Sequence, residues 1–132
     1  MAEANLRKPG RRIIAAGAGL AIKLYNFGIV GGRTLDVTGY PKTVIQEGHP
    51  IIRSTASGEY KPMPLNGGGT ALAALPANHE YVGLLRAEII TADPRAAIMT
   101  NGVANDACFE FDFSGIKTAF KAQVPFIEFQ AD

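Results

Sequence analysis

The chain has 132 residues, of which 47% are hydrophobic, and its 13 Lys and Arg against 12 Asp and Glu leave a formal charge of +1. This length and composition predict one domain with a single core and exclude global disorder. The near-zero charge argues against a nucleic-acid binder. The single cysteine excludes an intramolecular disulfide and a cysteine-rich zinc site.

The N-terminal region combines a basic segment with a mildly apolar one. Its cations are Arg7, Lys8, Arg11 and Arg12, and the stretch IIAAGAGLAI follows at residues 13–22. This order is that of a secretory signal, but the glycines, the alanines and the lack of a clear cleavage site argue against one. Ten apolar residues cover about 15 Å, which is too short to span a membrane. We interpret residues 1–12 as a free arm and the chain as soluble.

Short β-branched or aromatic runs predict strands between residues 22 and 55. The runs are IKLYNFGIV, RTLDV, TVIQ and PIIRST. Glycine and proline punctuate them at the spacing of a small barrel or sandwich. Residues 66–69 are expected to form a loop, and residues 70–75 one helical turn that Pro76 ends.

The second half of the chain predicts further strands and one short helix. The apolar run 81–91 and AAIMT are strand-like, and Asn101-Gly102 is typical of a hairpin turn. ACFEFDF alternates as a strand would, with its phenylalanines on the core face. Ser114 is expected to cap a helix over GIKTAFKA, and VPFIEFQ to close the chain as a strand. The whole pattern predicts a mainly β domain with one or two short helices.

Nucleotide and metal sites find little support in the sequence. Gly17 and Gly19 stand where a dinucleotide-binding turn needs glycines, but Ile22 occupies the third small position. His49 and His79 have no spacing typical of metal ligands. We therefore expect no cofactor and no metal.

Catalytic residues are also not apparent. Glu110 and Asp112 could be proposed as a glycosidase pair, but carboxylates two apart on a strand are more typical of a solvated edge. Cys108 shares their predicted face, so its thiol is expected to be inert. The serines lack a local histidine partner and a nucleophile-elbow motif. We expect no enzymatic activity.

The basic arm has three possible interpretations. Four cations without an interleaved aromatic residue, before a neutral body, argue against a nucleic-acid tail. A disordered segment followed by an apolar stretch can order on a partner's exposed sheet edge, where main-chain hydrogen bonds and apolar burial offset the lost chain entropy. A solvated tail that binds nothing is the alternative.

Several stretches between residues 48 and 129 form a pattern when taken together. They are EGHPIIRS, SGEYKPMPL, NGGGTALAAL, EYVGLLRAEIITAD, AAIMTNGVANDACFEF and GIKTAFKAQVPFIEF. This pattern resembles the head decoration, or capsid cement, proteins of lambda-type tailed phages. The resemblance implies a β-tulip-like or barrel-like subunit that forms a homotrimer on an expanded icosahedral head. Residues 25–42 add strand-like sequence before the matching region, which leaves the boundary between arm and body open.

The resemblance also implies which residues meet the major capsid protein. Residues 1–24 would be the capsid-binding arm, and residues 25–132 the decoration-type domain. The apolar contacts would be Ile13, Ile14, Leu20 and Ile22, with Arg7, Lys8, Arg11 and Arg12 facing the shell.

The implied function is structural. Trimers made in the host cytoplasm would bridge capsomers on the capsid exterior of the virion, without binding nucleic acid or membrane. One alternative is a small β-barrel module of a surface fibre, which predicts a concave ligand or glycan pocket. Another is an enzyme with an unrecognised site, which predicts a buried cluster of perturbed acids or histidines.

Overall fold

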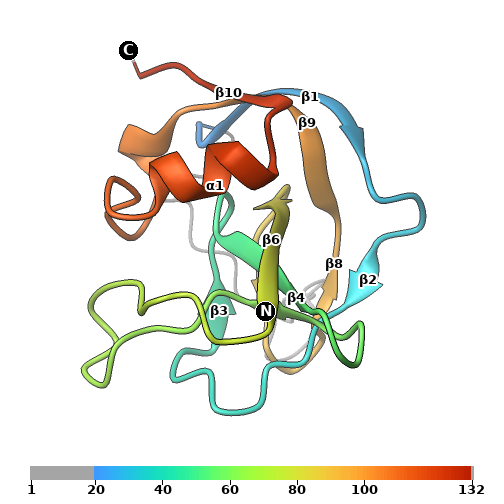
Figure 1. Cartoon of the computed structure of the whole chain (residues 1–132), viewed down its shortest axis with the longest axis vertical. Coiled ribbons are helices and arrows are strands. Elements are labelled where there is room, and N and C mark those ends of the chain that lie inside the picture. Colours follow the sequence, from blue (N-terminus) through green and yellow to red (C-terminus); the bar gives the residue numbers. More distant parts are fainter. Residues whose placement is uncertain (1–19, 132) are drawn as a thin grey trace, which may run out of the picture.

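The centre of the molecule is an open β-sheet (Figure 1), seen in a computed structural model that describes residues 20–131. The strand order is β1 (Ile22–Gly28), β9 (Ile98–Ala104), β6 (His79–Leu85), β4 (Pro50–Ser54) and β5 (Tyr60–Pro62). A sixth strand, β10 (Ile127–Phe129), runs parallel to β9, whereas all other pairs are antiparallel. The predicted mainly β class is confirmed, but the sheets do not close into a barrel.

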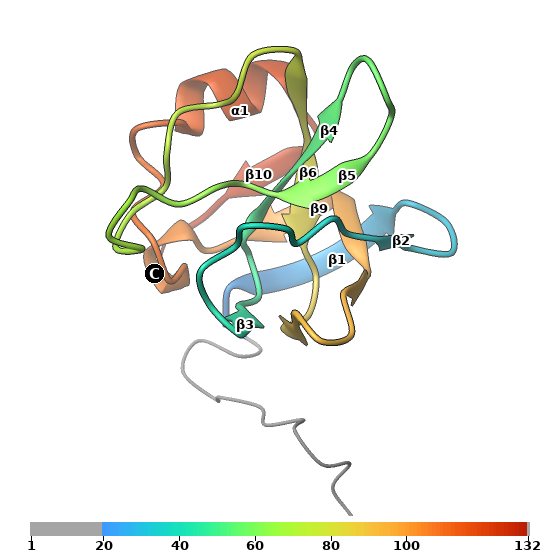
Figure 2. The ribbon, with the colours of Figure 1, turned by 90° about the horizontal axis from the view of Figure 1, so that it is seen from below.

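Two small sheets and one helix complete the described fold. β2 (Arg33–Thr34) pairs with β8 (Arg95–Ala96), and β3 (Val44–Ile45) pairs with β7 (Ile89–Ile90). Asp106–Cys108 forms a 3-10 turn, and α1 (Lys117–Gln123) is the single α-helix among residues 20–131. α1 lies on one side of the central sheet and β3 on the other (Figure 2).

The central strands bury both of their faces. Neighbouring residues of β4, β6 and β9 point alternately into two hydrophobic clusters. The cluster beneath α1 contains Ile52, Leu84 and Met99, and the opposite cluster contains Ile51, Leu85 and Ile98. This burial explains why each of these strands contains two consecutive large apolar residues at its buried part, without the alternation of a half-exposed strand.

Strand predictions succeed best in the first half of the chain. The four runs predicted between residues 22 and 55 contain β1, β2, β3 and β4. The apolar run 81–91 is divided into β6 and β7 by residues 86–88. No helix forms at residues 70–75, where Leu72 instead makes an isolated bridge to Leu65.

The prediction that ACFEFDF forms a strand is wrong, but the prediction that alternate residues face the core is right for Phe111 and Phe113. Asn105 accepts a hydrogen bond from the Ala107 amide (3.0 Å) and thereby caps the 3-10 turn, and an irregular segment follows. Phe111 and Phe113 are buried, while Glu110 and Asp112 are exposed. Alternate residues can therefore face the core without strand pairing.

Two local signals near the C-terminal half are also overturned. Asn101-Gly102 is no hairpin turn, because both residues lie inside β9. A Cβ at position 102 would overlap the carbonyl oxygen of Leu24 in β1, so the glycine permits close strand approach. Ser114 does not cap α1, since the capping position is Ile116 and no side chain bonds there.

Gly83 allows β6 and β9 to approach each other. A Cβ at this position would overlap the Met99 carbonyl oxygen and lie 3.1 Å from Cγ2 of Ile98. We expect Gly83→Ala to lower the free energy of unfolding by about 1–3 kcal/mol, because the clash is with backbone and cannot be relieved by a side-chain rotation. Urea denaturation measures this loss. The control is Gly67→Ala, whose new methyl group meets nothing within 4 Å and should change stability by less than about 0.5 kcal/mol.

Candidate functional site

Large apolar side chains are exposed mainly along the beginning of the described chain. Five of the six exposed large hydrophobic residues of the described part lie between residues 20 and 30, and the sixth is Phe126. The five, which we call the β1 surface, are Leu20, Leu24, Tyr25, Phe27 and Val30. Leu24 and Phe27 are each 58% exposed and Val30 is 83% exposed. Such a concentration of apolar groups is typical of an interaction site.

β1 is an outer strand of the central sheet, so one of its edges has no strand partner among residues 20–131. Its pairing with β9 shifts register between Ile22 and Leu24, and again around Phe27. Register shifts of this kind bend and twist a strand. Residues 23–27 are all exposed, although the guanidinium carbon of Arg86 lies 3.9 Å from the centre of the Tyr25 ring. The strand therefore presents both an open hydrogen-bonding edge and apolar side chains.

The start of the folded body is fixed just before β1. Ala21 is fully buried, and its carbonyl accepts a hydrogen bond from the Asn105 amide (2.7 Å). The Ile22 amide donates to Glu47 Oε1 (2.8 Å). Residues 22–24 thus belong to the sheet, and the predicted boundary between arm and body at residue 24 falls inside β1.

The predicted arm contacts separate into two groups. Leu20 is 60% exposed at the start of the described chain, whereas Ile22 is half-buried against the core beneath α1. The other predicted contacts, Arg7, Lys8, Arg11, Arg12, Ile13 and Ile14, lie outside the described residues. The sequence interpretation missed the exposed members of β1 itself. Their only local signal is the polar interruption of the run by Lys23 and Asn26, which indicates exposure without revealing its extent.

A buried histidine is one of the two titratable groups, among the described residues, whose pKa is shifted most. His49 is 4% exposed, and its Nε2 contacts the Met63 carbonyl oxygen at 2.8 Å. Burial lowers the pKa of His49 to about 4, against the opposing effect of that hydrogen bond. The edges of Tyr40 and Phe111 pack on the ring, at centroid distances of 5.6 and 6.0 Å.

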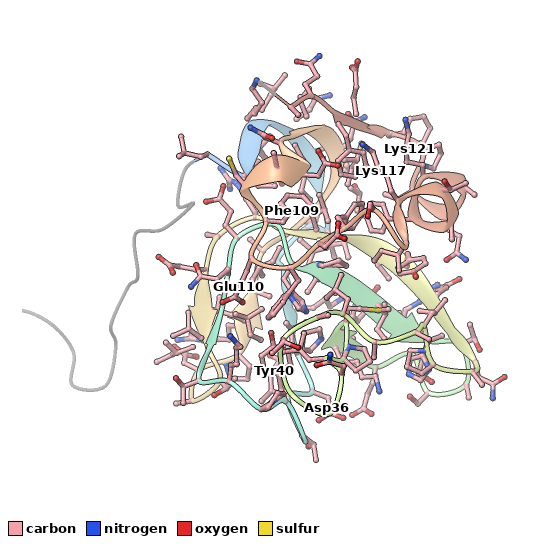
Figure 3. The ribbon with its side chains drawn as sticks, turned by 90° about the vertical axis from the view of Figure 1, so that its left-hand side faces the viewer. Asp36, Tyr40, Phe109, Glu110, Lys117 and Lys121 are labelled. Atoms are coloured by element: carbon pink, nitrogen blue, oxygen red, sulfur yellow. The ribbon has the colours of Figure 1, made fainter. Side chains whose placement is uncertain are left out.

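Tyr40 belongs to the same buried group. Burial, and then the negative charge of Glu110, raise the pKa of the Tyr40 phenol. Figure 3 shows Tyr40 on the same side of the molecule as Glu110 and Asp36. The hollow beside His49 has a volume of about 10 Å³, room for one water molecule at most. His49 therefore has no space for a substrate next to it, whereas Tyr40 is half-buried and also borders the surface.

The surface hollow on the other side of Tyr40 is also small. Its volume is about 80 Å³, and prolines form much of its wall. Pockets for small ligands are usually about 300–1,000 Å³. This hollow is therefore smaller than such pockets.

The carboxylates once considered as a glycosidase pair have separate structural partners. Glu110 forms an ion pair with Lys42 (3.6 Å). Asp112 accepts a hydrogen bond from the Ser114 amide (3.0 Å), and bonds from Ser114 lower the pKa of this carboxyl group. The lowered pKa of Asp112 is the opposite of the raised pKa that a general acid requires.

Three general features bear on function. Among the residues that the structure describes, no three His, Cys, Asp or Glu side chains gather as metal ligands. In the same part of the chain, no helix is long and apolar enough to cross a membrane.

Comparison with known proteins identifies no relative: no family model matches the chain, and no curated protein or solved structure is significantly similar to it.

Proposed function

We propose that this chain is a structural protein that decorates and stabilises an icosahedral phage head by binding the major capsid protein. The observation that carries the proposal is the β1 surface, where exposed apolar side chains accompany a strand edge that has no strand partner among residues 20–131. The sequence resemblance to head decoration proteins supports the same function. The interior packing of His49 and Tyr40 offers no comparable support for catalysis.

The attachment would combine three kinds of interaction. A partner strand added to the free edge of β1 would gain main-chain hydrogen bonds. Leu24, Phe27 and Val30 would lose their exposure to water, and full burial of such a side chain contributes roughly 1.5–3 kcal/mol. The cations of residues 7–12 would add attraction to an acidic capsid surface.

Shell stabilisation would then follow from multiplicity. A homotrimer carries three such surfaces, and simultaneous engagement of neighbouring capsomers raises the effective concentration of each further contact. Many modest interfaces would brace the shell without one tight site. No covalent chemistry is required, so the function needs neither cofactor nor metal.

Removal of residues 1–19 tests the proposal, because every described strand begins after this segment. We expect the truncated protein to lose at least about tenfold in affinity for expanded empty heads, because the basic and apolar segment before Leu20 is gone. Co-sedimentation with purified heads measures this loss. Undiminished binding would refute the role of the N-terminal segment.

Point variants test the β1 surface separately. Phe27→Ser should weaken the same co-sedimentation, whereas Phe126→Ser should not, although Phe126 is equally large and 70% exposed. Equal effects of the two changes would show that β1 has no special role.

Light scattering of the free protein should give about 42 kDa, three times the chain mass of 14.0 kDa, if the trimer forms before attachment.

A further inference from the structure

One tyrosine ring lies close to two arginine side chains. Tyr60 is the first residue of β5 and is half-buried. The guanidinium carbon of Arg33, in β2, lies 5.4 Å from the centre of its ring, and that of Arg53, in β4, lies 5.9 Å away. At these distances the ring attracts both cations and restricts their orientation. Three strands that are separate in sequence thus place two guanidinium groups around one aromatic ring.

The two arginines differ in how their charges are compensated. Arg53 forms an ion pair with Glu80 across the β4–β6 pairing. Arg33 donates from Nη1 to the carbonyl oxygens of Gly32 (2.6 Å) and Val30 (3.3 Å). Within residues 20–131 no carboxylate pairs with Arg33. Its charge is therefore held in place by the backbone and the ring, but it is not neutralised there.

Arg33 also lies where two open hollows of the surface meet. One hollow, of about 420 Å³, extends past Tyr60 and Arg53 to Glu80. The other, of about 490 Å³, extends along β2 to Arg95 of β8. Arg95 is bound to Asp93 through two hydrogen bonds (2.8 and 3.0 Å). Figure 1 shows β2 and β8 together, on the side of the molecule away from α1.

We propose that Arg33, supported by Tyr60 and Arg53, binds a carboxylate side chain in an acidic segment of a partner protein. A guanidinium group presents donors in a planar fork that matches a carboxylate, and such charge-assisted bonds are stronger than neutral ones. Because two carbonyls and the ring already orient Arg33, little further side-chain entropy is lost on binding. The open hollows on both sides let an extended chain pass across the site.

An acidic peptide fits this surface better than a nucleic acid does. Phosphate backbones are bound by several uncompensated cations at once. Here Arg53 and Arg95 already have carboxylate partners, so Arg33 is the one arginine of this surface whose charge stays uncompensated among the described residues. The site does not depend on the proposed head-binding function, because it uses neither residues 1–19 nor an open strand edge.

The test uses a twelve-residue peptide of alternating glycine and glutamate, with a glycine–glutamine peptide as the uncharged control. In NMR titrations of the full chain at low salt, the Arg33 Nε–Hε resonance should shift in a saturable way with the glutamate peptide only. Arg33→Gln should weaken binding about tenfold, as expected for loss of a charge-assisted hydrogen bond. Lys121→Gln removes one exposed charge of α1 (Figure 3) and should leave binding unchanged within twofold.

Several results would overturn the proposal. One is an Arg33 resonance that does not respond, or that responds equally to the glutamine peptide. Another is equal weakening by Arg33→Gln and Lys121→Gln, which would mean that only net charge matters. Tighter binding of a twelve-nucleotide oligothymidine than of the glutamate peptide would assign the surface to nucleic acid instead. None of these measurements requires capsids, so failure here would be distinguishable from failure of the head-binding function.

Discussion

Phe120→Ala should reduce the free energy of unfolding by about 3–5 kcal/mol, the range found for large aromatic truncations in protein cores. Phe120 is fully buried and projects from α1 into the core cluster beneath the helix. Its ring contacts those of Tyr81, Phe113 and Phe129 at centroid distances of 5.4, 5.1 and 6.1 Å. The substitution would remove all three ring contacts and leave a cavity, because the surrounding structure relaxes only partially around a deleted side chain.

This loss would be a large part of the total, since domains of this size are stable by only about 5–15 kcal/mol. Urea denaturation monitored by circular dichroism measures it. Phe126→Ala is the matched control, because the same atoms are removed from a ring that is 70% exposed and should cost no more than about 0.5 kcal/mol. Equal losses at the two positions would show that α1 does not anchor the core as described.

The β class of the fold is predictable because local chemistry limits what these segments can do. Runs such as PIIRST combine β-branched residues with proline and glycine boundaries, and β4 forms where that run predicts it. Which strands pair is harder to predict, because pairing depends on contacts between residues that are distant in sequence. Gly102 looks locally like half of a hairpin turn, but its role is set by the Leu24 carbonyl about eighty positions earlier.

The aromatic segment before α1 shows a second limit on what the sequence predicts. Alternation in ACFEFDF correctly indicates that Phe111 and Phe113 are buried. It predicts the wrong backbone because burial alone does not require a ladder of hydrogen bonds. Here the Asn105 cap starts a 3-10 turn, and the rings of Phe109 and Phe113 then pack edge to face at 5.3 Å.

The candidate site shows a third limit. The run IKLYNFGIV predicts a strand, and β1 forms. Whether such a strand lies at the centre or the edge of a sheet depends on how many strands follow and in what order. The sequence of Leu24, Tyr25 and Phe27 is equally compatible with a buried strand. These side chains are exposed because β1 is the outermost strand of the sheet, next to β9.

Acidification should destabilise the protein between about pH 6.5 and pH 4, and His49 should account for much of the effect. Burial lowers the pKa of His49 to about 4 in the folded protein, against 6.5 for an ordinary histidine. Between these values the unfolded chain binds a proton that the folded chain does not, so stability falls as the pH falls. The lowered pKa of His49 contributes about 3 kcal/mol to the free energy of unfolding at pH 7, and this contribution is lost below pH 4.

His49→Gln should flatten this pH dependence. A glutamine amide can still donate to the Met63 carbonyl, which the His49 Nε2 approaches at 2.8 Å, but it cannot be protonated in this range. His79→Gln is the control, because His79 is the other histidine of the chain and its ring is half-exposed. Between pH 7 and pH 4, the free energy of unfolding should therefore vary much less with pH for His49→Gln than for the unmodified protein. For His79→Gln it should vary with pH as it does for the unmodified protein.

An NMR titration of the unmodified protein tests the same point without any variant. The imidazole resonances of His49 should remain those of the neutral ring down to about pH 4, because a charged ring beside Tyr40 and Phe111 would be deprived of water. A midpoint near pH 6.5 would contradict the buried, uncharged state. It would also mean that the contact between residues 40 and 49 opens to solvent, and with it the packing that holds the segment before β3 against the sheet.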